Sequence, residues 1–173
     1  GECVGAIVGK NPGSAKPKLD ESGNPILGKL SDICLDGDRM LPSVRNRFRD
    51  AYEQNGKGIP ENAFVQVWNL FYLCNKNLDD ACVQIAHFAK PSEYECPSEK
   101  KDLNIVWFAW GGNDKRLDAF KGRFIKRNFQ NFHYDHLSKT IKCHTPFHLG
   151  ADFAKHPQGM PKTPIIKHLE TVL

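Results

Sequence analysis

Three polar residues in this sequence have the side-chain chemistry and the placement expected of a small catalytic or binding site. Asn11 follows an apolar run within Gly9-Lys10-Asn11-Pro12-Gly13, and Asn69 lies near the end of another apolar run. An asparagine amide is not a strong base, but it can orient a water molecule or bind a base edge through its donor and its acceptor. His156 could donate a hydrogen bond to an oxygen on which negative charge collects.

Each of these residues also has a purely structural interpretation. Asn-Pro-Gly is a common turn sequence, and an asparagine at the end of a strand often binds local backbone. His156 precedes a proline and could simply be a surface residue. Both interpretations remain open at this point.

The elements that must position these residues follow from apolar periodicity and turn residues. Helices are predicted at residues 41–54, at 79–88 and from 113 or 114 to about 128, each with apolar residues at helical spacing. Strands are predicted at four apolar runs followed by turn residues, namely 4–8, 63–73, 103–110 and 133–143.

Alternating strands and helices predict an α/β fold with parallel strands and right-handed crossovers. We expect a single domain over residues 1–173, built as a three-layer α/β/α sandwich around a central four-stranded parallel sheet. Residues 14–38 match neither period and are interpreted as a long loop insertion. Because loops after parallel strands meet at the carboxyl edge of a sheet, Asn11, Asn69 and His156 should share one cleft.

Composition narrows the class of protein. The 173 residues are 40% hydrophobic and 25% charged, which excludes a disordered chain, a coiled coil or collagen. No apolar run is long enough to span a membrane, so we expect a cytoplasmic monomer with no membrane partner. The six cysteines form no Cys-x-x-Cys pair. They predict reduced, mostly buried thiols and no metal or other cofactor, with a cluster of distant cysteines as the lesser alternative.

Positive charge is concentrated in one stretch, although the net charge of +4 is mild. Such a stretch is either a phosphate-binding surface or a solvated helix face. It contains Lys115, Arg116, Lys121, Arg123, Lys126 and Arg127.

These motifs, in this order, resemble the uracil-DNA glycosylase superfamily. Residues 9–13 resemble the Gly-x-Asn-Pro-Gly water-positioning loop of its mismatch-specific branch, and Arg47-Phe48 resembles the start of the next helix of that branch. Residues 156–160, His-Pro-Gln-Gly-Met, resemble the His-Pro-Ser-x-Leu loop that enters the minor groove. The order also resembles a bacterial family of unknown function with an Asn-Pro-Ser/Thr loop, an Asn-Leu-Phe strand and a Trp-Gly strand end.

The resemblance implies a monofunctional DNA glycosylase that flips a damaged or modified base and hydrolyses its N-glycosidic bond without a cofactor. The biological role would be DNA repair or defence against modified foreign DNA. Asn11 and His156 would be catalytic, while Asn69, Phe71 and Pro12 would bind the base. DNA would be contacted by Gly159, by Met160 as an apolar wedge, and by Lys115, Arg116, Arg123, Lys126 and Arg127.

Departures from the superfamily pattern bear on the substrate. No acidic residue adjoins Asn11 and Gln158 replaces a serine, so plain uracil is not the expected base. The 14–38 segment could instead shape a pocket for a bulky modified pyrimidine, with Trp68, Phe71 or Tyr72 as aromatic faces. Lys10 keeps a lyase mechanism open. The alternatives are a catalytically silent nucleic-acid or nucleotide-binding module and, last, an enzyme acting on small nucleotides.

Overall fold

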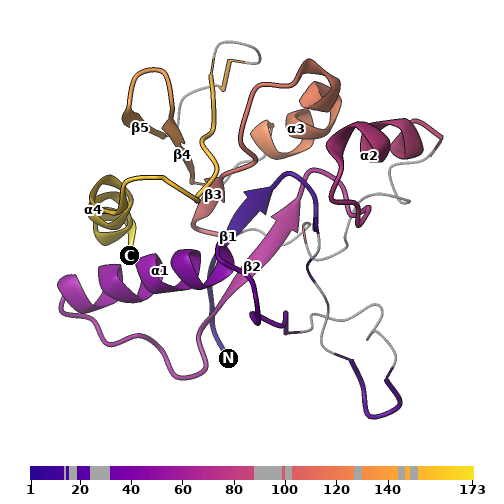
Figure 1. Ribbon diagram of the computed structural model, residues 1–173. Helices are drawn as coiled ribbons and strands as arrows, with labels where there is room; N and C mark the ends of the chain where they lie inside the picture. Colours follow the sequence, from indigo (N-terminus) through magenta and orange to yellow (C-terminus); the bar gives the residue numbers. More distant parts are fainter. Residues whose placement is uncertain are drawn as a thin grey trace.

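The computed structural model shows a mixed α/β protein in which helices pack on a central β-sheet (Figure 1). None of the helices that it describes is long and apolar enough to cross a membrane. The residues described are 1–13, 15, 19–23, 32–87, 99, 103–126, 130–143, 147–148 and 152–173. The 14–38 segment therefore lies partly outside the described residues.

The sheet has five strands in the order β2-β1-β3-β4-β5. β1 is an interior strand that pairs in parallel with β2 and with β3, β3 pairs in parallel with β4, and β4 and β5 are antiparallel. The strands are β1 Cys3–Gly9, β2 Phe64–Asn69, β3 Val106–Phe108, β4 Asn131–Asp135 and β5 Thr140–Cys143.

Apolar residues on both faces of β1 explain why it lies in the interior of the sheet. Ile7 belongs to one hydrophobic cluster and Val8 to the other, because successive side chains of a strand point to opposite faces. Ile7 pairs with Val67 on one side and with Trp107 on the other. The strands predicted in the runs 4–8, 63–73 and 103–110 are confirmed as β1, β2 and β3. β2 and β3 are shorter than the apolar runs that contain them.

One face of the sheet is covered by α1 Leu41–Gln54 and α4 Lys162–Val172, which pack against each other (Figure 1). The backbone N–H groups of Met40 and Leu41 donate to the carboxylate of Asp38 just before α1 begins, both at 2.7 Å. The predicted bounds of α1 are confirmed, because its apolar spacing and its stop at Asn55-Gly56 are local signals.

Among the described residues, the helices on the other face are short. α2 Leu78–Ile85 begins at Asn77, whose side chain accepts from the Asp79 N–H at 2.9 Å. A 3₁₀ turn at Lys115–Leu117 leads into α3 Asp118–Ile125. Both helices gather near the carboxyl ends of β1 and β2, so the expected pair of complete helical layers is not formed (Figure 1).

The expected four-stranded parallel sheet is wrong at its far edge. The run 133–143 was predicted as one strand, but it is a hairpin of β4 and β5, with Lys139 at φ 57° just before β5. The Asp135 carboxylate accepts from the Ser138 N–H at 2.7 Å and holds this turn. The sequence analysis also did not predict α4, in which Ile165, Ile166 and Leu169 face the core.

Candidate active site

The loops after β1 and β2 lie against each other at the carboxyl edge of the sheet. The Leu70 N–H donates to the carbonyl oxygens of Gly9 and Lys10, at 3.0 and 3.1 Å. A Cβ on Gly9 would lie 2.9 Å from Oδ1 of Asn69, so a larger residue at this position would require the Asn69 side chain to shift. Asn69 is 6% exposed, so it is buried behind the surface of this edge.

Asn11 connects these two loops through its side-chain nitrogen. Nδ2 donates to the carbonyl oxygen of Asn75 at 2.7 Å and more weakly to that of Leu73 at 3.4 Å. Because only the NH₂ group can donate, these bonds fix which way the amide faces. Its oxygen accepts no hydrogen bond from the described residues, and this leaves it able to bind water.

His156 lies at the same edge, half-buried beside the loop that follows β3. A Cβ on Gly111 would lie 3.0 Å from Cβ of His156, and the Gly111 N–H donates to the carbonyl oxygen of Ala154 at 2.9 Å. Nδ1 of His156 accepts from the Gln158 N–H at 3.2 Å, so the neutral ring carries its proton on Nε2. The imidazole is thereby a hydrogen-bond donor at Nε2.

Burial and one nearby cation favour the neutral form of this imidazole. Burial lowers the pKa of His156, the positive charge of Lys10 lowers that pKa further, and the Asp38 carboxylate opposes both effects. Burial also lowers the pKa of Lys10, which Asp114 partly counteracts. A hydrogen bond from Arg116 in turn lowers the pKa of Asp114 to about 2.

The structure thus places Asn11, Asn69 and His156 at one edge of the sheet. A cavity of about 510 Å³ is lined in part by Gln158 of the His156 loop and by Asp38 and Arg39 from the segment before α1, but Asn11, Asn69 and His156 are not among its lining residues. A second cavity, of about 590 Å³, lies away from these residues, beside α1 and β2. Pro12 is half-buried in the loop after β1, where its carbonyl oxygen accepts from the Ala15 N–H at 2.9 Å.

Two expected contact residues belong to the core instead. Phe71 is 0% exposed and packs on Phe120 with ring centroids 5.6 Å apart, so its ring does not face a ligand. Met160 is 4% exposed in the α1 and α4 cluster, and its carbonyl oxygen accepts from Arg47 at 3.1 Å. The exposed residues of that loop are Gln158 and Gly159. Trp68, another candidate aromatic face, is also fully buried.

Much of the basic stretch is occupied by internal contacts. Arg123 forms a bidentate ion pair with the buried Glu99, with N···O distances of 3.0 and 3.1 Å. Its guanidinium group also donates to the carbonyl oxygens of Asn69 and Leu70. These internal contacts disfavour the expected role of Arg123 as a phosphate contact, which stays a prediction.

Other members of the stretch differ in how far solvent can reach them. Lys121 is 1% exposed and bonds Asp118 at 2.7 Å, whereas Arg116 is exposed but paired with Asp114 and Asp79. Lys115 and Lys126 are exposed. Arg127 lies outside the described residues.

Protein-family models, curated proteins and solved structures were each compared with this chain. None of the three comparisons finds a match. The superfamily resemblance therefore remains an expectation from the motifs alone.

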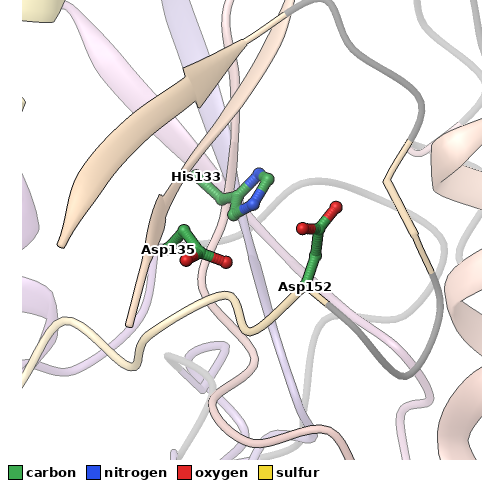
Figure 2. Close-up of side chains that lie close together, drawn as sticks. All are labelled: His133, Asp135 and Asp152. Carbon is green, nitrogen blue, oxygen red and sulfur yellow. The ribbon is translucent and has the colours of Figure 1, made fainter. Parts of the chain in front are cut away.

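The motifs of the sequence did not indicate a second cluster of potential ligand side chains, on β4 and after it. His133 and Asp135 alternate along β4 and so point to the same face, and Asp152 reaches them from a later segment (Figure 2). The His-x-Asp spacing was a signal in the sequence, but nothing local marked Asp152 as its partner. The thiols were also misjudged, because none of the five described cysteines is buried, and all five are free.

Proposed function

We propose that this chain is a monofunctional DNA glycosylase that hydrolyses the N-glycosidic bond of a flipped damaged or modified base. The proposal rests on one juxtaposition at the carboxyl edge of the sheet. There an asparagine amide is held with its oxygen unused by the described residues, and a half-buried imidazole is held as an Nε2 donor.

These two groups suit the charge changes of glycosidic hydrolysis. As the bond between C1′ and the base nitrogen breaks, positive charge develops on the sugar and negative charge on the base. Oδ1 of Asn11 would accept a hydrogen bond from the attacking water, whose oxygen joins C1′ and whose proton passes ultimately to the departing base. Nε2–H of His156 would stabilise a base oxygen, and the charge of Lys10 would favour the anion.

Recognition of the base would come from Asn69 and the backbone around it. The amide of Asn69 offers a donor and an acceptor beside Gly9, which suits the edge of an extruded base. Phe71 cannot supply the stacking face, because it is buried. DNA contacts would fall to Gly159, Lys115 and Lys126, and Arg116 would have to leave its carboxylate partners to join them.

The test is base release from DNA duplexes that carry uracil, mismatched thymine or modified cytosines, scored as alkali-labile abasic sites. We expect Asn11→Ala to lower base release by about 100-fold or more while DNA affinity stays nearly unchanged, since its contact matters chiefly in the transition state. Asn104→Ala is the matched control, because Asn104 is exposed two residues before β3, at the opposite edge. An Asn11→Ala protein with the parental rate on every substrate contradicts the assignment.

A catalytically silent binding module is the second candidate, and the contacts of Asn11 favour it. Its amide nitrogen is bonded to protein carbonyl groups, as in a purely structural loop. Met160 is also buried rather than exposed as a wedge. DNA binding by the parent chain without base release from any duplex would select this function.

A further inference from the structure

A buried cluster of three metal-ligand side chains lies at the far side of the sheet from β1. His133 and Asp135 belong to β4, and Asp152 belongs to the segment that leads back toward His156. One potential ligand atom from each residue lies within 4.8 Å of the others. All three residues are at most 3% exposed, and their side chains point toward a common centre (Figure 2).

The imidazole of this cluster has an unexplained buried nitrogen. Nε2 of His133 is buried and has no hydrogen-bond partner among the described residues. A buried polar atom without a partner is destabilising, and most buried polar atoms therefore have one.

The two carboxylates are held in place by bonds on their outer sides. Asp135 accepts from the N–H and hydroxyl of Ser138, at 2.7 and 2.8 Å, and from the Phe153 N–H at 3.2 Å. Asp152 accepts from the His148 N–H at 2.7 Å. Outer hydrogen bonds of this kind orient carboxylates that bind metals.

The ammonium group of Lys142 lies between the carboxylates of Asp135 and Asp152. Nζ of Lys142, on β5, is 2.5 Å from Asp152 and 3.5 Å from Asp135. One ammonium charge does not balance two carboxylates, whereas a divalent cation would. Lys142 is 33% exposed on the edge strand, so its long side chain can turn out to solvent without disturbing the core.

We propose that His133, Asp135 and Asp152 bind one divalent transition-metal ion, with Lys142 displaced to solvent. One imidazole and two carboxylates suit Zn²⁺ or Co²⁺ better than Mg²⁺, which prefers oxygen ligands. Ligand atoms of one ion with bonds of about 2.1 Å lie roughly 3–4 Å apart, so side-chain movements on the order of 1 Å would complete the set. Water would fill the remaining positions.

Such an ion would also fasten the segment that carries His156. After Asp152, the carbonyl oxygen of Phe153 accepts from His136, and the Lys155 N–H donates to the carbonyl oxygen of Tyr134, both at 3.0 Å. These two bonds hold the segment beside the end of β4. His156 follows Asp152 by four residues, so an ion bound at Asp152 would restrain the segment close to His156. Metal binding itself does not depend on the glycosylase proposal.

Metal binding can be measured on the chelator-treated chain by calorimetry with Zn²⁺ and by the visible spectrum with Co²⁺. We expect one ion per chain, a higher unfolding temperature with Zn²⁺, and a Co²⁺ spectrum without thiolate charge-transfer bands. The last point matters because free thiols are present, and Cys143, next to Lys142, packs on the opposite face.

Three variants separate this site from adventitious binding. His133→Gln should weaken Zn²⁺ binding by about 100-fold, as loss of a ligand does, while Lys142→Met should tighten it by at least about tenfold by removing the competing ammonium. His87→Gln is the control, since His87 is exposed and distant in sequence. A parent chain without a Zn²⁺-induced rise in unfolding temperature, equal affinities of the parent and His133→Gln, or thiolate bands would overturn the proposal.

Discussion

At the scale of single residues, the structure defines how two polar side chains are oriented. The NH₂ group of Asn11 donates to the carbonyl oxygens of Leu73 and Asn75, and Nδ1 of His156 accepts a hydrogen bond from the Gln158 N–H. Each side chain has one donor group and one acceptor group, and the protein binds one of them. The groups that remain are the amide oxygen of Asn11, an acceptor, and Nε2–H of His156, a donor. Preorganisation of this kind is the main way in which a buried polar group contributes to catalysis.

The protonation of His156 gives the prediction at this scale. We expect an NMR titration to place its pKa below 6.5, because burial and the charge of Lys10 both disfavour the imidazolium. Lys10→Met should raise that pKa, and Lys126→Met should leave it unchanged. If neutral His156 is the donor, base release stays constant from pH 8 to about 6.5 and falls only on further acidification. An unmoved pKa in Lys10→Met would show that the two side chains are not coupled.

At the scale of elements, Arg123 on α3 holds the end of β2 in place. Its guanidinium group bonds the carbonyl oxygens of Asn69 and Leu70 and pairs with Glu99, which is 1% exposed. It also lies over the ring of Phe124, 4.4 Å from the ring centroid. One side chain thus connects α3, the carboxyl end of β2 and a residue 24 positions earlier in the chain.

Removal of this arginine should destabilise the protein rather than weaken DNA binding alone. We expect Arg123→Met to lower the free energy of unfolding by about 3–5 kcal/mol, because Glu99 would be left buried without its partner. Lys126→Met, on the exposed side of the same stretch, should change it by less than about 0.5 kcal/mol. Denaturant unfolding measures both values. A stable Arg123→Met protein that has lost DNA affinity would restore the phosphate-contact interpretation.

At the scale of the whole molecule, a net charge of +4 leaves the distribution of charge to decide where DNA binds. In the described part of the basic stretch, Lys115 and Lys126 are exposed, and the other cations have carboxylate partners. The surface that can contact DNA phosphates is therefore smaller than the sequence indicates. It lies on α3 and the turn before it, beside the carboxyl ends of β1 and β2 (Figure 1).

Paired charge reversals test this surface. Lys115→Glu with Lys126→Glu should weaken DNA binding and reduce the slope of log affinity against log salt by about 2, if each lysine neutralises one phosphate. Lys162→Glu with Lys167→Glu, on α4, changes the net charge equally and should leave the slope nearly unchanged. Equal effects of the two pairs on affinity would mean that only net charge matters.

The amino-acid sequence alone predicts the α/β class, the bounds of α1 and the cores of β1, β2 and β3. It also placed Asn11, Asn69 and His156 near strand ends or connecting loops, hence at one edge of the sheet. These features follow from apolar spacing and turn residues, which act between neighbours in the chain. The same local rules could not distinguish one long strand at 133–143 from a hairpin, because both alternate in polarity.

Which of the chemically suitable residues are accessible is known only from the three-dimensional fold. Phe71 and Met160 are buried because elements distant in the chain cover them, and Arg123 is internal because it meets Glu99. Asp152 joins His133 and Asp135 only after the chain has returned along the end of β4. Burial and pairing depend on contacts between distant segments, and no local pattern of residue types records which segments will meet.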